Sequence, residues 1–263
     1  MKPLLIDTHS HIYLPDLASG LEGILTRARA EGVSAILLPA IDSETHEALI
    51  ETAQNHPDIC LPMMGLHPCS VKENYQEELQ IARKHLLALR DKQSSLPVAV
   101  GECGLDYYWD KTHVELQKWA FAEQIRWALE FDLPVVIHSR DSTDDCIDMI
   151  ASFQNGSLRG VFHCFSGTAD QARRITDLGF HLGIGGVITY KKSGLDIAIK
   201  DIPLQWLVME TDAPYLSPVP FRGKPNEPSY LVHSLQKLAD TKEIALAVAA
   251  EATTNNARFL FRI

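Results

Sequence analysis

The sequence predicts an α/β fold of the (β/α)8 TIM-barrel type. Eight short apolar runs alternate with longer helical patterns, and 263 residues are enough for one such barrel. The runs lack a strict alternation of apolar and polar residues, as expected for parallel strands that are covered on both sides. The alternative is an open doubly wound sheet, but no glycine-rich phosphate loop follows the first run. We therefore expect a single domain over residues 1–263.

The predicted elements follow one another along the whole chain. The strands are expected at residues 3–9, 34–40, 60–67, 96–103, 133–139, 159–165, 180–186 and 205–211. Helical patterns are clearest at residues 43–55, 73–90, 229–240 and 243–260. Three start signals for helices are present: Thr112 with Glu115, Thr168 with Gln171, and Ser142 with Asp145. The proline-rich segment 213–229 is expected to be irregular.

The composition restricts the class of protein. The net charge of −10 argues against a general polyanion binder, so any nucleic-acid contact has to be local, through metals or a small basic patch. The five cysteines form no CxxC motif, which indicates reduced thiols in a cytoplasmic protein. The apolar run near the N-terminus is too short for a signal peptide, and no run approaches the ~18 residues of a membrane span.

Polar side chains gather where the predicted strands end, which is the end of a barrel that carries chemistry. In "DTHSH", Asp7, His9 and His11 are spaced by two residues and would share one face of the first strand. The other strand ends carry His67, Glu102 with Asp106, His138 with Arg140, His163, and Glu210 with Asp212. Any one of these residues can be a hydrogen-bonded structural group. Together they predict a divalent-metal site, because buried imidazoles and carboxylates need partners.

Two other groups of residues have a structural and a functional interpretation. Cys103 and Cys164 adjoin proposed ligands but are expected to point away from them and to be packed, inert thiols. Lys191 and Lys192 can be a solvated pair or a phosphate contact.

The motifs resemble those of the TatD family of metal-dependent hydrolases, within the amidohydrolase-like barrels. The matching stretches are "DTHSH" (7–11), "GLHP" (65–68), "GECGLDYYW" (101–109), "HSRD" (138–141), "HCFSG" (163–167), "METDAPYL" (209–216) and "RGKPNEP" (222–228). They come in the family's order, although Pro225 stands where members often carry a basic or polar residue. The resemblance implies a divalent-metal phosphodiester hydrolase, typically a deoxyribonuclease and in some members a 3′–5′ exonuclease.

The resemblance also implies roles for individual residues. His9, His11 and Asp212 would hold one metal ion, His138 and His163 the second, and Glu102 would bridge the two. We expect a two-metal-activated water as nucleophile. Asp212 would take a proton from this water and give one to the leaving 3′ oxygen. Arg140 and His67 would contact the phosphate, while Asp106 and Glu210 would orient the ligands. The metal is expected to be Zn, Mn or Mg, and the histidine count favours the transition metals.

The expected substrate is DNA, at short single-stranded ends. Aromatic residues that follow strand ends can stack on bases or simply pack in loops: Tyr107, Tyr108, Trp109, Phe165, Tyr190, Tyr215 and Phe221. Arg222 and Lys224 can bind backbone phosphates. The alternatives are a barrel hydrolase of another small phosphoester, ester or lactone, a non-catalytic binding protein, and a subunit in which hydrolysis is incidental. DNA or RNA preference, direction of digestion, native metal and oligomeric state stay open, with a monomer favoured.

Overall fold

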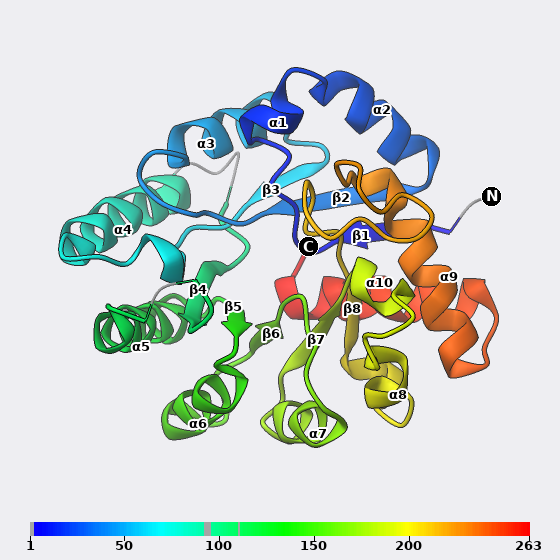
Figure 1. The fold of residues 1–263 in the computed structure, drawn as a ribbon. Coiled ribbons are helices and arrows are strands. Elements are labelled where there is room, and N and C mark those ends of the chain that lie inside the picture. The colour runs from blue at the N-terminus through cyan, green and yellow to red at the C-terminus, as the bar shows by residue number, and fades with distance from the viewer. Residues whose placement is uncertain (1–2, 92–95, 110) are drawn as a thin grey trace.

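The computed structural model describes residues 3–91, 96–109 and 111–263. Parallel strands form the centre of the molecule, and helices surround them (Figure 1). The strands are β1 (Leu5–Asp7), β2 (Val33–Leu38), β3 (Cys60–Pro62), β4 (Val100–Asp106), β5 (Val135–Arg140), β6 (Gly160–Phe162), β7 (His181–Ile184) and β8 (Leu207–Met209).

The strands close on themselves through two short seams. Strands β1 to β3 pair in sequence order, and so do β4 to β8. Met64 bridges Val100 at the seam between β3 and β4, and Ser10 bridges Ala213 just beyond β1 and β8. This closure confirms the predicted barrel and excludes the open sheet, whose first and last strands would not meet.

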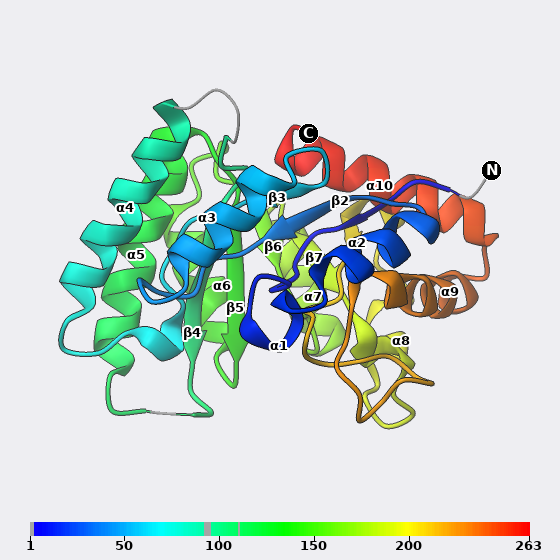
Figure 2. The same cartoon turned by 90° about the horizontal axis from the view of Figure 1, so that it is seen from above.

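The helices cover the outside of the barrel. They are α1 (Pro15–Ala18), α2 (Leu21–Ala30), α3 (His46–Asn55), α4 (Tyr75–Asp91), α5 (Val114–Phe131), α6 (Thr143–Phe153), α7 (Ala169–Asp177), α8 (Leu195–Ile199), α9 (Leu231–Lys242) and α10 (Leu246–Phe261). Short 3-10 turns, η1 (Pro68–Ser70), η2 (Gly186–Thr189), η3 (Leu204–Trp206) and η4 (Pro228–Tyr230), lie between them. Helices α9 and α10 lie side by side, and α10 also packs against the chain's first strand (Figure 2).

The barrel interior has its own small apolar core. Ile6, Leu37, Met63, Val136, Val161 and Val208 meet there, one side chain from each of six strands or strand ends. Ala257, Leu260 and Phe261 of α10 pack against this core beside Val98 and Ala99, which precede β4. Helix α10 therefore seals the amino-terminal end of the barrel and leaves the opposite end for chemistry.

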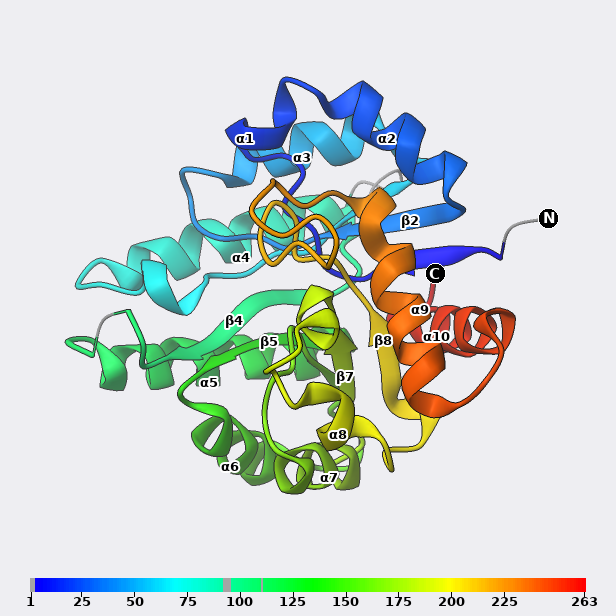
Figure 3. The same cartoon turned by 45° about the vertical axis from the view of Figure 1, so that its right-hand side comes forward.

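The long loop after β8 crosses that opposite end (Figure 3). It is tied to α2 by Arg27, whose Nε and Nη2 donate to the two oxygens of Glu227 at 2.8 and 2.6 Å. Asn226 in the same loop is fully buried and donates to the carbonyl oxygens of Thr211 and Tyr215, at 2.7 and 2.8 Å. These bonds fix the path of the segment that carries Asp212.

The predicted helix starts have different outcomes. Thr168 forms a capping box with Gln171 at the start of α7, as predicted. The prediction for Thr112 is wrong, because the residue at the N-cap of α5 is His113. Ser142 does precede α6, but its hydroxyl donates to the carbonyl oxygen of Leu105 at 2.6 Å and does not cap the helix. Strand β4 runs three residues further than predicted, through Asp106.

The structure also bears on the expectations about the cysteines and about membrane spans. All five cysteines are free thiols. Among the helices of the described residues, none combines the length and apolarity required to cross a membrane.

The capping box provides a test of the fold. Replacing Thr168 by Ala removes the acceptor for the Gln171 amide, which lies 3.2 Å from the hydroxyl. We expect the free energy of unfolding to fall by about 1 kcal/mol, the usual cost of losing an N-cap. Urea denaturation measures this, and Thr168→Ser, which keeps the hydroxyl, should lose clearly less. Equal losses in the two variants would contradict the capping role.

Candidate metal centre

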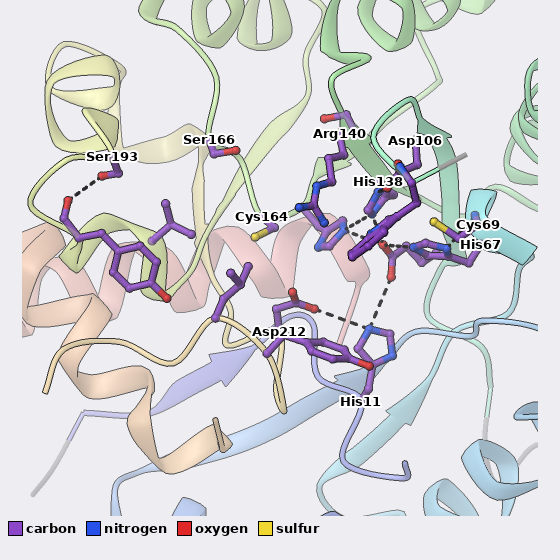
Figure 4. Close-up of a pocket in the computed structure, with 18 of the residues that line it drawn as sticks. His11, His67, Cys69, Asp106, His138, Arg140, Cys164, Ser166, Ser193 and Asp212 are labelled. Atoms are coloured by element: carbon purple, nitrogen blue, oxygen red, sulfur yellow. Dashed lines mark hydrogen bonds and ion pairs between the residues drawn. The ribbon is translucent and has the colours of Figure 1, made fainter. Parts of the chain in front are cut away.

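A cavity of about 1330 Å³ opens at the carboxyl ends of the strands. The imidazole and carboxylate groups that the sequence places at strand ends lie in its floor (Figure 4). His11, His67, His138 and Asp212 reach it from four different parts of the chain. The cavity is therefore the place where barrel closure brings the predicted site together.

Glu102 lies at the centre of the site, with only 2% of its surface exposed. Its Oε2 lies 3.0 Å from His9 Nε2 and 3.5 Å from His11 Nε2. Asp212 Oδ1 lies 3.8 Å from the same nitrogen of His9 and 3.6 Å from that of His11. These four side chains form one set of donor atoms around Oε2.

The other oxygen of Glu102 faces a second set. Its Oε1 lies 2.7 Å from His163 Nε2 and 2.8 Å from His138 Nδ1. His67 Nε2 joins them at 3.3 Å. The structure thus brings together all six side chains that the resemblance implies as metal ligands. It also places His67, expected to contact the phosphate, closer to Glu102 than the proposed ligand His11. The position of His67 at the end of the third predicted strand is the sequence feature that indicates this location in the site.

The donor set fits divalent cations. Within the described residues, three overlapping groups have donor atoms within 4.8 Å of one another: His9 with His163 and Asp212, His9 with His11 and Glu102, and His67 with Glu102 and His138. Imidazole nitrogens of His163 and His138 approach to 3.4 Å, and the Nδ1 atoms of His9 and His163 are buried without a hydrogen-bond partner. Mixed nitrogen and oxygen ligands of this kind suit Zn²⁺ or Mn²⁺.

The charges in the site depend strongly on burial. Burial alone would raise the pKa of Glu102, but His163, His67 and His9 hold it well below its usual value. Burial raises the pKa of Asp212 to about 7. For His138, burial lowers the pKa, but its bonds to Asp106 and Glu102 outweigh this effect and raise it to about 9. The site therefore retains protons at neutral pH that a metal ion would displace.

Two further acidic side chains lie beside the imidazoles. Asp106 Oδ2 lies 2.9 Å from His138 Nε2, and its other oxygen accepts the backbone amides of Tyr108 and Trp109 at 2.9 and 3.0 Å. Glu210 is fully buried, accepts the backbone amide of Cys164, and lies 3.8 Å from His163 Nδ1. Asp106 therefore fixes the ring orientation of His138, whereas Glu210 lies near His163 without a hydrogen bond to it.

Asp7 has a different place from the one predicted. Strand β1 ends at Asp7, so His9 and His11 lie beyond the strand and do not share its face. The carboxylate of Asp7 accepts the amide and the hydroxyl of Thr211 at 2.9 and 2.6 Å. It ties the end of β1 to the segment after β8, next to Asp212, and is not part of the donor set.

The cysteines are partly as predicted. Cys103 is fully buried, and burial raises the pKa of its thiol well above the usual value. The predicted orientation of Cys164 is wrong, because this residue is in a left-handed turn (φ 47°) and lines the cavity. Burial raises the pKa of the Cys164 thiol too, which disfavours the thiolate form of both cysteines.

Cations and aromatic rings surround the cavity mouth. The Arg140 guanidinium carbon lies 3.8 Å from the centre of the Tyr108 ring and 5.2 Å from that of Trp109. Trp109, Tyr190, Tyr215 and Arg222 line the cavity, whereas Lys224 is not among the lining residues. Three of the predicted stacking candidates have structural roles instead: Phe165 is buried, Phe221 stacks on Tyr230, and Tyr107 donates to Asp145.

The geometry predicts that Glu102 is shared by two metal ions. We expect the wild type to bind two ions of Mn²⁺ or Zn²⁺, and Glu102→Gln to weaken both by more than about 100-fold, since the loss of an outer-shell partner alone costs about 10–100-fold. Titration calorimetry and elemental analysis of the isolated protein measure this. Glu251→Ala, on the exposed face of α10, is the matched control. Loss of only one ion in Glu102→Gln would contradict the shared role.

The raised pKa of His138 predicts that metal binding competes with protons. Below its pKa of about 9 the metal-free imidazole is protonated, and a ligand must be neutral. The apparent affinity for metal should therefore increase with pH from 6 to about 9, with release of about one proton from His138 near neutral pH. Calorimetry in buffers of different ionisation enthalpy counts the protons. An affinity that is constant over this range would disprove the assignment.

Known proteins share this fold and these motifs. Residues 6–262 match the family described as "TatD related DNase". The uncharacterized metal-dependent hydrolase YabD of Bacillus subtilis is 37% identical over 262 residues, which are 99% of this chain and 100% of that protein. The 3'-5' ssDNA/RNA exonuclease TatD of Yersinia pseudotuberculosis is 32% identical over 246 residues, 91% of this chain and 92% of that protein.

The fold agrees with these sequence matches. The crystal structure of YjjV, a TatD homolog from Escherichia coli K12, superposes with a TM-score of 0.89 at 32% identity and covers 98% of each chain. The resemblance inferred from the motifs is thereby confirmed over nearly the whole chain. This protein belongs to the TatD family of metal-dependent hydrolases.

Proposed function

We propose that the protein hydrolyses phosphodiester bonds at the end of a single-stranded nucleic acid, with DNA as the first substrate to test. The observation that carries the proposal is the position of Glu102, whose two oxygens each face a separate set of imidazoles. A paired site of this kind suits an in-line displacement at phosphorus, in which the attacking and leaving oxygens both need stabilisation.

The residues that would hold the ions are those of the two sets: His9, His11 and Asp212 for one, His138 and His163 for the other, and Glu102 for both. When bound, the ions would supply Lewis-acid polarisation of the phosphate and a water that is acidic enough to ionise near neutral pH. The protein would orient these ligands through Asp106, which is bonded to His138, and through Glu210, which lies near His163. The barrel would enclose the site.

Three side chains that line the cavity would act on the substrate. Asp212, with a pKa of about 7, is suited to accept a proton from the attacking water and to return one to the leaving oxygen. Arg140 is held against Tyr108 and lines the cavity, where its guanidinium would bind a phosphate oxygen. His67 lines the cavity beside Glu102 and would donate a hydrogen bond to the same phosphate.

Two observations support a single-stranded substrate. The exposed rings of Trp109 and Tyr215 line the cavity and can stack on unpaired bases. The net charge of −10 disfavours long duplex, which a protein binds through many basic contacts. The Yersinia relative named as a 3'-5' ssDNA/RNA exonuclease makes the 3′ end the expected starting point.

Cleavage of an end-labelled oligonucleotide tests the proposal. With Mn²⁺, Mg²⁺ or Zn²⁺, a single strand labelled at its 5′ end should give a ladder that shortens from the 3′ end. Glu102→Gln should lower the rate by at least about 1000-fold, because a paired metal site supplies most of the stabilisation in such reactions. Gel electrophoresis measures the ladder, with chelator and Glu251→Ala as controls. If the metal-loaded wild type leaves the oligonucleotide intact, small phosphodiesters and lactones become the substrates to test.

A further inference from the structure

A tight turn between η2 and α8 carries two adjacent lysines into the wall of the cavity. The Ser193 amide donates to the Tyr190 carbonyl oxygen at 3.1 Å, which places Lys191 and Lys192 at the two central positions of the turn. Both lysines line the cavity and are exposed to solvent. Ser193 lies across the cavity from His67 and Cys69 (Figure 4). We call residues 190–193 the cationic turn.

The cationic turn is held in place from three sides. The Tyr190 hydroxyl donates to the Ser217 carbonyl oxygen at 2.9 Å, and the Ser193 hydroxyl donates back to the Tyr190 carbonyl oxygen at 3.0 Å. The Arg222 guanidinium carbon lies 4.0 Å from the centre of the Tyr190 ring. Tyr190 thus joins the turn to the loop after β8 and brings a third cation to the same wall.

These cations have no carboxylate to neutralise them. Within the described residues, no salt bridge involves Lys191, Lys192 or Arg222, although many other exposed cations of this acidic protein are paired with Asp or Glu. Adjacent like charges repel one another and gain nothing from the fold. Three cations without a carboxylate partner, gathered on one cavity wall, therefore form a surface that favours anions.

The size and lining of the cavity indicate what the anion is. At about 1330 Å³ the cavity exceeds the range of about 300–1000 Å³ that is typical of small-molecule sites. It has room for more than the one phosphate at the metal centre, and the rings of Trp109 and Tyr215 on the same cavity favour nucleotides over a bare polyphosphate.

We propose that the cationic turn, together with Arg222, binds backbone phosphates of a single-stranded nucleic acid at a distance from the bond that is cleaved. This proposal rests on the proposed function and names how the same site selects its substrate: by length. A strand that spans the cavity gains contacts with the turn, whereas a short phosphodiester confined to the cavity floor does not.

Salt-dependent binding tests the cationic turn. The probe is a fluorescent single strand of about 12 nucleotides with cleavage-resistant phosphorothioate linkages, titrated with the metal-loaded protein over a series of KCl concentrations. For Lys191→Gln/Lys192→Gln we expect about tenfold weaker binding and a slope of log K against log salt that is smaller by about 1.4, or about 0.7 for each phosphate that is no longer neutralised. With a cleavable strand, KM should rise by a similar factor while kcat changes less than about twofold.

The matched control removes the same charge elsewhere. Lys84→Gln/Lys200→Gln changes two exposed lysines of α4 and of the end of α8, neither of which lines the cavity. It should keep the wild-type slope, because counterion release counts only phosphates that are contacted. Equal slopes and affinities in the two double variants would overturn the role of the turn, and the oligonucleotide ladder of the wild type would still decide the proposed function separately. A wild type that does not bind the strand at low salt overturns the role of the turn as well.

Discussion

The buried carboxylate of Glu102 is the group on which the site depends. A charge with 2% exposure is costly unless it is compensated, and here the imidazoles of His9, His138 and His163 provide the compensation at 2.7 to 3.0 Å. Strand β4 can bring Glu102 to these imidazoles because its backbone approaches β5 closely at Gly104. A Cβ atom at Gly104 would overlap the carbonyl oxygen of His138, so any larger residue there would push β4 away from β5. Backbone packing and site electrostatics are thus set by the same few residues.

Closure of the barrel is the second constraint, and both backbone and side-chain hydrogen bonds make it. At the seam between β1 and β8, the backbone amides of Thr8, His11 and Asp212 donate to the carbonyl oxygens of Met209, Ala213 and His9 at 3.0, 2.7 and 2.8 Å. The Asp7 carboxylate spans this seam to Thr211, and Asn226 holds the carbonyl oxygens of Thr211 and Tyr215 from the other side. Asp212 lies between these bonds. Its position relative to His9 and His11 is therefore a consequence of how the first and last strands are joined.

The sequence predicts well the features that depend on local patterns, and poorly those that depend on contacts between residues far apart in the chain. Buried parallel strands are continuous apolar runs, so the eight strands and the polar groups at their ends can be recognised without knowledge of contacts. The place of Asp7 cannot, because its partner Thr211 lies 204 residues away. Thr112 fails as a cap for a local reason, since the helix starts one residue later than its motif implies. The sequence predicts Cys164 in a strand, but β6 ends at Phe162, and the turn that follows rotates the thiol into the cavity.

The charges of the site also impose an order on binding. In the metal-free site the carboxyl groups of Glu102, Asp106 and Asp212 lie beside the imidazoles of His67 and His138, whose pKa values are raised to about 9, so the floor has little net charge to attract a phosphate. The divalent cations that the donor set fits would make the floor positive. The charges of Lys191, Lys192 and Arg222 do not depend on metal, so the phosphate contacts that we propose for this wall would be available in either state. With the proposed substrate, a nucleic-acid strand would be held at the wall first, and its end would be drawn to the floor only when the metals are in place.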